Sequence, residues 1–566
     1  MIKIRDLTFE YFERDEEGYL TDMVNAIRGI NFDAGKGEIV AIAGRNGSGK
    51  STFAKILNRL LAAIEGTVVI TGMDATDSEN TMEIRKNVGM VFQNPDEQLV
   101  GSIVEEDVAF GAENIGIPVQ ELRRRVDEAI VQAGLVDKDN DTKVSDYSSG
   151  QGDSLREICK KRVNDLSGGE KQKVSIAGVL AMKPKCIVLD EATSMLDPSS
   201  RSQILDIMCE LREKYGLTVI MITHIMEELL LADTIYVFDQ GRIVLKGDRD
   251  KIFADKEIFE DMGLEIPVVL NIARALYKKG IVNTYRLYSV DEIIKNIKKN
   301  HPHSFMLDKM EPEIRKETVK VNPTKAILMN SVTFGYGGKD VLRNVSLTIS
   351  KGDYVAVVGE TGAGKTTLLQ LLPALLKPTK GEVYVDGVDV WDKTTDKKKL
   401  RCKIGYLFQY PEQQLFGKNV YEDVVFGPRN VGISEIQAES RAYEAIKLVG
   451  LPDSIYDTPL NKLSGGQRRR VALAGVLAMK PEYLILDEPT AGLDPEGRKN
   501  MLDIIDALHR EAGMTVIMIT HDADFVACRA NRVVALDNGR VICDKSPVEA
   551  FVSLYKSKKH QNDDKA

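Results

Sequence analysis

The chain has 566 residues, of which 43% are hydrophobic and 28% charged, and its formal net charge is −9. Because domains average about 150 residues, this length predicts three or four folded units rather than one core. The composition is typical of a globular protein, and the acidic balance argues against nucleic acid as the main partner, since nucleic-acid-binding proteins usually carry a basic surplus.

Neither the cysteines nor the apolar runs indicate a secreted or membrane-spanning chain. The six cysteines are scattered without CxxC spacing, which fits a reducing compartment. The N-terminus is charged from its third residue, and no run approaches the roughly 18 apolar residues of a membrane helix. We therefore expect the chain to reach a membrane only through partners.

The first chemically informative stretch begins with the apolar run 38–43, which is followed by GRNGSGKST and by a helical pattern at 53–61. A strand, a glycine-rich loop and a helix in this order are typical of a phosphate-binding loop, whose backbone N–H groups close around phosphates. We expect Lys50 to contact the β- and γ-phosphates and Ser51 to hold magnesium. The phosphate-binding residues predicted for the first half are Gly44, Asn46, Gly47, Ser48, Gly49, Lys50, Ser51 and Thr52.

Further along, the apolar run CIVLDE ends in two acids, and a second strand-like run ends in ITH. We expect Asp190 to face the magnesium and Glu191 to polarise an attacking water, because phosphoryl transfer needs a positioned nucleophile and charge compensation. We expect His224 to contact the γ-phosphate. The alternatives, a solvated acidic pair and a structural histidine, are weaker beside a phosphate loop.

The second half of the chain repeats these motifs in order, which indicates a duplicated domain rather than a short-period structural array. The offset between the halves falls from 316 at Gln93 and Gln409 to 297 at Ser167 and Ser464, so the first half carries 19 extra residues between these positions. They fall in the polar stretch 138–165, which predicts a surface insertion. The corresponding second-half residues are Gly359, Thr361, Gly362, Ala363, Gly364, Lys365, Thr366, Thr367, Asp487, Glu488 and His521.

Two further motifs, LSGGE at 166–170 and LSGGQ at 463–467, precede the acidic runs. Together with the loops, the glutamines and the histidines, they make nearly the whole chain resemble the ATP-binding-cassette (ABC) superfamily. The resemblance implies two α/β P-loop domains, each with a mixed or parallel sheet and a helical subdomain. It also implies that ATP and Mg²⁺ are sandwiched between one half's phosphate loop and the other half's LSGG.

Carried over residue by residue, the resemblance gives two composite sites. The first joins Lys50, Ser51, Gln93, Asp190, Glu191 and His224 with Ser464, Gly465 and Gly466. The second joins Lys365, Thr366, Gln409, Asp487, Glu488 and His521 with Ser167, Gly168 and Gly169. The two glutamines would add to the magnesium ligands and to the catalytic set.

Four more positions match family features. Tyr11 and Tyr336 match the aromatic residue that stacks on adenine, the alternative being a strand-edge tyrosine in a core. Asp197 and Asp494 match the loop that communicates across the pair of cassettes. Because both halves keep every catalytic group, we expect hydrolysis at both sites, with Glu170 in place of the usual glutamine as a small departure.

A narrower resemblance lies in the segments 93–116 and 409–432, which share FQ-x-P-x-x-Q-L, E-D-V-x-F-G and N-x-G. They are similar to the ATPases of energy-coupling factor (ECF) importers, so the chain resembles a fusion of that family's two ATPase subunits. This implies a peripheral position on the cytoplasmic face of the membrane. The implied partners are a transmembrane coupling subunit and a membrane substrate-binding subunit.

The same segments imply a groove for helices of the coupling subunit. Its acids, which we expect either to pair with the partner's arginines or to form a solvated face, are Glu106, Asp107, Glu422 and Asp423. Its expected apolar lining is Leu99, Val100, Leu415 and Phe416.

We expect a first ABC domain at 1–248, a linker with a small C-terminal subdomain at 249–322, a second ABC domain at 323–545 and a polar tail at 546–566. Ribosome-binding tandem cassettes resemble this arrangement but have long basic helical arms, whereas Pro267, Pro302 and Pro312 interrupt this linker. Its amphipathic parts, 263–280 and 289–300, predict short helices. An ECF importer ATPase is therefore favoured over a soluble ABC ATPase acting on ribosome or nucleic acid, and over another importer type.

Overall fold

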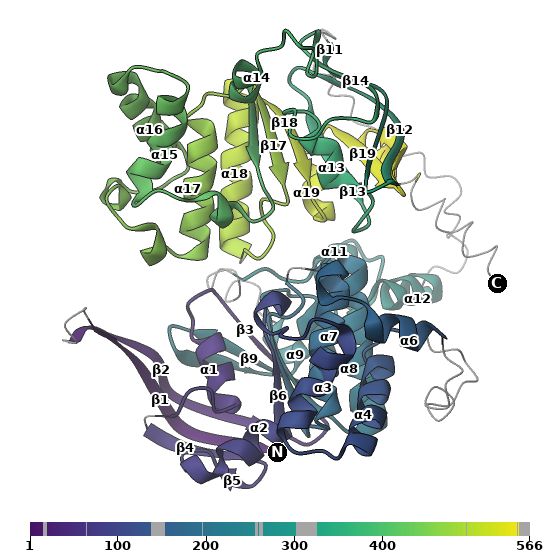
Figure 1. Ribbon diagram of the computed structural model, residues 1–566. Helices are drawn as coiled ribbons and strands as arrows, with labels where there is room; N and C mark the ends of the chain where they lie inside the picture. Colours follow the sequence, from purple (N-terminus) through teal and green to yellow (C-terminus); the bar gives the residue numbers. More distant parts are fainter. Residues whose placement is uncertain are drawn as a thin grey trace. The chain divides into compact units, whose positions relative to one another are not determined.

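The computed structural model describes residues 1–14, 20–63, 65–136, 153–194, 196–254, 264–300, 325–493 and 495–551, with the single positions 259 and 553. Its contacts divide the chain into two units, Met1–Lys309 and Met310–Ala566 (Figure 1). Each unit is described by itself.

The first unit contains two sheets. A four-stranded antiparallel sheet has the order β2-β1-β4-β5, and a six-stranded sheet has the order β10-β9-β3-β8-β7-β6. The larger sheet is parallel except for β10, which runs antiparallel to β9. The strands are β1 (Ile2–Arg14), β2 (Leu20–Ala34), β3 (Ile39–Gly44), β4 (Glu65–Ile70), β5 (Met73–Asp74), β6 (Val88–Val91), β7 (Cys186–Asp190), β8 (Thr218–Ile222), β9 (Thr234–Asp239) and β10 (Arg242–Gly247).

The helices of the first unit cover the larger sheet and form a separate helical layer (Figure 1). They are α1 (Lys50–Leu57), α2 (Thr81–Asn87), α3 (Val104–Asn114), α4 (Val119–Gln132), α6 (Asp153–Lys160), α7 (Gly168–Ala181) and α8 (Pro198–Tyr215). Every residue of β3, β7 and β8 is buried, as expected for parallel strands covered on both faces. One core fills the space between the two sheets and α1, and another joins the larger sheet to α3, α4 and α7.

A small helical subdomain follows the first domain and belongs to the first unit. It contains α9 (Arg249–Ile252), α11 (Val268–Lys278) and α12 (Val290–Asn300), so both amphipathic linker segments form the expected short helices. Leu264 and Leu270 extend the first unit's core, and Ala273, Val282 and Ile293 form a small core of their own. The linker residues 301–324 lie outside the described part of the chain.

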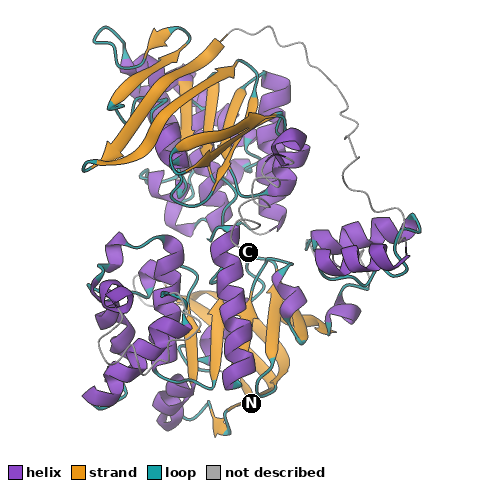
Figure 2. Ribbon diagram, turned by 90° about the vertical axis from the view of Figure 1, so that its right-hand side faces the viewer, coloured by secondary structure: helices purple, strands orange, loops and turns teal. Residues whose placement is uncertain are grey.

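The second unit repeats this architecture, with sheets ordered β12-β11-β14-β15 and β16-β17-β18-β13-β19-β20. Its strands are β11 (Lys325–Tyr336), β12 (Lys339–Ser350), β13 (Tyr354–Gly359), β14 (Lys380–Val385), β15 (Val388–Asp389), β16 (Ile404–Leu407), β17 (Tyr483–Asp487), β18 (Thr515–Ile519), β19 (Arg532–Asp537) and β20 (Arg540–Lys545). Its helices are α13 (Lys365–Gln370), α14 (Lys397–Lys403), α15 (Val420–Asn430), α16 (Glu435–Leu448), α17 (Gly465–Leu477), α18 (Pro495–Ala512) and α19 (Ala523–Cys528). Helices pack against strands in both units (Figure 2), which confirms the predicted α/β class.

Three details differ from the sequence expectations or limit them. The helices after the phosphate loops begin at Lys50 and Lys365, three residues earlier than the apolar patterns suggest. In the predicted insertion, α6 is a regular helix, while 137–152 lie outside the described residues. Residues 547–551 are helical and Ala550 is buried in the second unit's core, so this unit extends beyond the predicted boundary at 545. Within the described residues, no helix is long and apolar enough to cross a membrane.

Candidate active sites

The phosphate loop of the first unit connects the end of β3 to the start of α1. Gly44 has φ 149° and Gly49 has φ 100°, both in a region that favours glycine. A Cβ on Gly44 would lie 2.3 Å from the Phe238 carbonyl oxygen, and one on Gly49 would lie 2.5 Å from the Ala26 carbonyl oxygen. Only glycine therefore fits at these two positions, where the loop backbone packs directly against neighbouring backbone.

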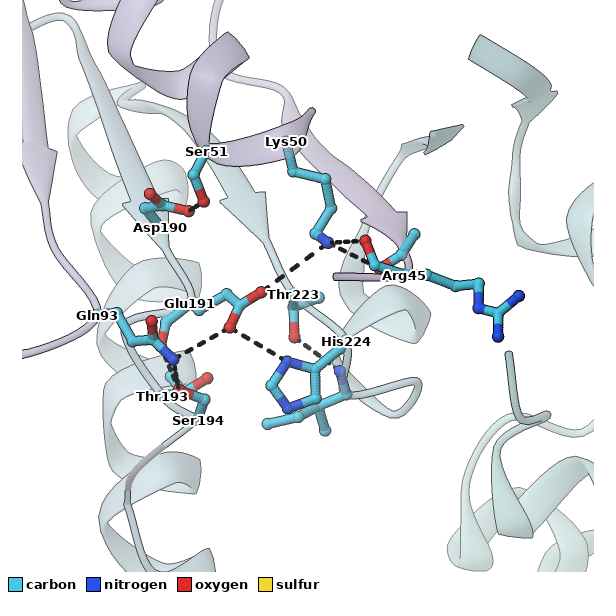
Figure 3. Close-up of polar contacts among 12 residues, drawn as sticks. Arg45, Lys50, Ser51, Gln93, Asp190, Glu191, Thr193, Ser194, Thr223 and His224 are labelled. Atoms are coloured by element: carbon cyan, nitrogen blue, oxygen red, sulfur yellow. Dashed lines mark hydrogen bonds and ion pairs between the residues drawn. The ribbon is translucent and has the colours of Figure 1, made fainter. Parts of the chain in front are cut away.

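Lys50 is only 4% exposed and turns back over its own loop. Its ammonium group donates hydrogen bonds to the carbonyl oxygens of Gly44 and Arg45, each at 2.8 Å. Figure 3 shows the Lys50 side chain pointing toward Glu191 while the Arg45 side chain points away. The loop thus holds one buried positive charge beside its N–H groups, as phosphate binding requires.

Ser51 and Asp190 meet at the start of α1 and the end of β7. The Ser51 hydroxyl donates a hydrogen bond of 3.0 Å to the Asp190 carboxylate (Figure 3). Burial raises the pKa of Asp190, and the hydrogen bond from Ser51 opposes that shift. A hydroxyl and a carboxylate are oxygen ligands that suit Mg²⁺, which usually keeps several waters and takes phosphate oxygens as well. Among the residues that the structure describes, no group of three or more His, Cys, Asp or Glu side chains is arranged to hold a metal ion.

Glu191 is the centre of the polar cluster in the first unit. It directly follows β7 with φ 51°, a region that non-glycine residues rarely adopt. Its carboxylate accepts a hydrogen bond of 3.2 Å from the Gln93 amide and lies 3.3 Å from Nδ1 of His224 and 4.0 Å from Nζ of Lys50. Burial disfavours the charged form of Glu191, but His224 and Lys50 outweigh it and lower the pKa. The cluster therefore contains an ionised carboxylate able to accept a proton.

The second unit repeats this cluster with small differences. The Lys365 ammonium donates to two carbonyl oxygens of its own loop at 2.8 and 2.9 Å. Glu488, with φ 48°, accepts a hydrogen bond of 3.2 Å from Gln409 and lies 3.1 Å from Nε2 of His521. Burial is again outweighed by the histidine and the lysine, and the pKa of Glu488 is lowered. The structure thus brings lysine, glutamine, glutamate and histidine together in both units, as the sequence predicts.

Asp487 lies beside Thr366, as Asp190 lies beside Ser51. Burial raises the pKa of Asp487 to about 6, against the hydrogen bond from Thr366. The Tyr406 hydroxyl also donates to this carboxylate, at 3.4 Å. The second unit therefore has the same pairing of a hydroxyl-bearing residue with a buried carboxyl group, and here the pKa of the carboxyl group is closer to neutrality.

Tyr11 lines a cavity of 510 Å³ together with Lys50, Ser51, Thr52 and Glu191. Its ring is 38% exposed, and its hydroxyl lies 3.2 Å from Oγ1 of Thr52. Tyr336, its counterpart, is 53% exposed. The alternative of a tyrosine buried in a core is therefore wrong for both, and an aromatic face is available beside the phosphate loop.

The LSGG serines lie at the starts of two helices and not in the clusters around Glu191 and Glu488. Ser167 caps α7, and its hydroxyl and backbone N–H both donate to Glu170 at 2.8 Å. Ser464 caps α17 in a matching capping box with Gln467. Asp197 caps α8 through the N–H groups of two serines, and Asp494 lies outside the described residues.

One pair of expected partner-binding acids has a different role. Asp107 is 8% exposed and accepts hydrogen bonds from the backbone N–H groups of Val100 and Gly101, at 2.7 and 2.8 Å. Asp423 holds the second unit's segment in the same way, at 2.8 Å from two backbone N–H groups. The prediction that these two acids face a partner is therefore wrong, because their carboxylates are already used inside the protein. Glu106, next to Asp107, is exposed.

The sequence reasoning missed Ser194, which joins the first cluster. Its hydroxyl lies 3.4 Å from the Gln93 amide and donates to the Glu191 carbonyl oxygen at 2.8 Å. The second half has Ala491 at this position, so the difference between EATS and EPTA was the available signal.

Comparison with known proteins agrees with this geometry. Residues 27–194 and 342–491 match the family model described as ABC transporter. A putative ABC transporter ATP-binding protein of Methanosarcina mazei is 34% identical over 98% of this chain and 90% of its own length. Another, from Caldanaerobacter subterraneus subsp. tengcongensis, is 33% identical over 95% of this chain and 90% of its own length. The energy-coupling factor transporter ATP-binding protein EcfA1 of Clostridium novyi is 42% identical over 52% of this chain and 96% of its own length.

The two loops, the two acidic clusters and the LSGG caps define an ATPase with two P-loop domains. The chain belongs to the ABC transporter family, as a protein with two ABC ATPase domains in tandem.

Proposed function

We propose that this chain is the ATP-hydrolysing subunit of an ECF importer, with one ATP and one Mg²⁺ at each of two sites. The observation that carries the proposal is the duplicated Lys–Gln–Glu–His cluster, found in a chain of which 52% matches an ECF transporter ATP-binding protein at 42% identity. The proposed partners are a transmembrane coupling subunit and a membrane substrate-binding subunit. The chain would lie on the cytoplasmic face of the membrane.

In the proposed chemistry of the first unit, the loop N–H groups and Lys50 bind the β- and γ-phosphates. Ser51 and Asp190 hold Mg²⁺, with Gln93 as a further ligand. When bound, Mg²⁺ would supply positive charge that offsets the negative charge developing on the phosphates. Glu191 accepts a proton from the attacking water at its carboxylate.

His224 lies 3.3 Å from the Glu191 carboxylate, and in this proposal it contacts the γ-phosphate. In the second unit, Lys365, Thr366, Gln409 and Asp487 take the binding roles, and Glu488 and His521 the catalytic roles. Tyr11 and Tyr336 offer ring faces to the adenine.

The proposal includes composite sites, which rest on the family resemblance. Ser464 would complete the site of Lys50, and Ser167 would complete the site of Lys365. A serine that caps a helix presents its hydroxyl and the helix N-terminus together, and both suit a γ-phosphate.

A groove between α3 and α4 supports a membrane partner. It has a volume of 460 Å³ and includes Val100, Glu106, Phe110 and Val119. Val100 is 64% exposed, Phe110 50% and Val119 81%, which is unusual for apolar side chains without a partner. An apolar floor with acids at its rim fits a basic amphipathic helix.

The second unit presents a similar apolar surface with more aromatic character. Phe416 is 65% exposed and packs edge to face against Phe426, with ring centroids 4.6 Å apart. Leu99 and Leu415, also expected in the lining, are only partly exposed and pack against the cores. The proposed contact surface therefore includes Val100 and Phe416 rather than the two leucines.

Co-expression with the membrane coupling and substrate-binding proteins of an ECF importer tests the proposal. We expect a stable membrane complex that takes up solute when ATP is hydrolysed in proteoliposomes. Glu106→Lys with Glu422→Lys should weaken the complex and leave basal ATPase activity unchanged. Glu79→Lys, which alters an exposed acid outside the groove, should leave both the complex and the ATPase activity unchanged. An ATPase that ignores these membrane proteins and is stimulated by ribosomes would instead favour a soluble function.

A further inference from the structure

One buried carboxyl group near the first cluster has no part in the chemistry above. Glu228 is 2% exposed and lies in a short 3₁₀ helix, Glu228–Leu231, four residues after His224. A buried carboxyl group costs free energy unless it is hydrogen-bonded, so its partners indicate what it stabilises.

The hydrogen-bond partner of Glu228 is a hydroxyl group of another loop. The Thr193 hydroxyl donates a hydrogen bond to the Glu228 carboxyl group. Burial raises the pKa of Glu228, and Thr193, Thr223 and the nearby Arg201 oppose the shift. Both threonines are themselves buried, at 4% and 2% exposed.

The two threonines flank the catalytic pair in sequence. Thr193 is the second residue after Glu191, and Thr223 immediately precedes His224. Thr223 also accepts a hydrogen bond of 2.9 Å from the Ile225 N–H, which fixes the backbone around His224 (Figure 3). The Glu228 side chain therefore joins the segment that follows His224 to the loop that carries Glu191. The His224 and Glu191 side chains lie 3.3 Å apart.

The second unit lacks this connection. Phe525 stands at the position of Glu228 and is buried in an apolar core. The His521 and Glu488 side chains are 23% and 18% exposed, whereas those of His224 and Glu191 are 9% and 10% exposed. The pair in the first unit is thus the more enclosed of the two, and it is the one that carries the buried carboxyl group.

We propose that Glu228 is a positioning residue for hydrolysis in the first unit: through its hydrogen bond to Thr193 it holds the loop that carries Glu191 against the segment that follows His224. The inference rests on the proposed catalytic roles of Glu191 and His224. It makes the two sites unequal in how they are organised, although both keep the same catalytic groups.

The test isolates the first unit in a Glu488→Gln background of the full chain and measures a single turnover. Thr193→Val and Glu228→Leu should each slow phosphate formation by about ten- to a hundredfold, because small misplacements of catalytic groups cost up to about that much. The ATP concentration for half-saturation should change by less than about twofold, since neither residue contacts the nucleotide pocket. Glu228→Gln keeps one acceptor oxygen and should restore part of the rate lost in Glu228→Leu.

Glu227→Gln is the matched control, because Glu227 is the exposed neighbour of Glu228 and should leave the rate unchanged. Thr193→Val is nearly isosteric and keeps the test decisive if Glu228→Leu does not fold. An unchanged rate in Thr193→Val, or in a folded Glu228→Leu, would overturn the inference. So would a loss of rate that is fully explained by a smaller fraction of protein able to bind ATP. Full turnover in the double variant Glu191→Gln with Glu488→Gln would instead show that these glutamates are not the general bases, which would contradict the proposed function.

Discussion

Two neighbouring acids in α3 differ in burial, and substituting each one tests whether the buried acid stabilises the fold and the exposed acid does not. Asp107 binds two backbone N–H groups, whereas Glu106 is exposed beside the groove. We predict that Asp107→Ala destabilises the first unit and that Glu106→Ala does not.

The size of the effect follows from the two hydrogen bonds, which are 2.7 and 2.8 Å long. Hydrogen bonds to charged groups contribute about 1.5–3 kcal/mol each, and water reaches part of this loop, so the lower figure applies to each bond. The expected loss is about 3 kcal/mol of the free energy of unfolding. For a domain of this size, that loss lowers Tm by about 6–12 °C.

Thermal unfolding of the nucleotide-free chain, followed by calorimetry, measures this shift. Glu106→Ala should stay within about 0.5 kcal/mol of the wild type, as surface substitutions usually do. Asp423→Ala should produce the same loss in the second unit, since its carboxylate makes the same two contacts. Equal stabilities for Asp107→Ala and Glu106→Ala would refute the reasoning.

Three further predictions concern the sites. Lys50→Ala and Lys365→Ala should each lower ATP turnover by about a hundredfold or more at the altered site, because each removes the positive charge beside the phosphates. If one of these variants kept nearly full activity, the two phosphate loops would not be equivalent. Burial raises the pKa of Asp487 from 3.8 to about 6, so the folded state favours the neutral form of this group. The group should therefore make the nucleotide-free second unit about 1 kcal/mol more stable at pH 5 than at pH 7.5. Asp487→Asn should abolish that difference in denaturation experiments. Glu170→Gln should change the free energy of unfolding by less than about 1 kcal/mol, because Gln467 forms the same capping box in the second unit. A much larger loss of stability would show that the carboxylate itself is required.

Much of the fold follows from patterns that are local in sequence. Strands β3 and β13 are almost entirely apolar, which is typical of strands buried in a parallel sheet. The glycine-rich loops that follow them are typical of phosphate binding. The clusters around Glu191 and Glu488 were predictable because the carboxyl ends of parallel strands meet at one edge of the sheet. Repetition of each motif in the same order in the second half supports these assignments.

Other features depend on contacts between segments that the sequence does not pair. Asp107 and Glu106 are both acidic, and only the return of the backbone at Gly101 decides which one is buried. Glu228 follows His224 in an ordinary helical pattern, and its role depends on Thr193 approaching from another loop. Such buried polar contacts are set by tertiary packing, so the sequence reasoning missed them.

The central claim is that each unit contains a hydrolysing ATP site with its own glutamate. Phosphate release by Glu191→Gln, Glu488→Gln and the double variant, measured alongside ATP binding, tests it most directly. We expect the double variant to bind ATP in both units and to lose turnover by about a hundredfold or more, because no general base remains. A double variant that hydrolyses ATP at the wild-type rate would contradict the account.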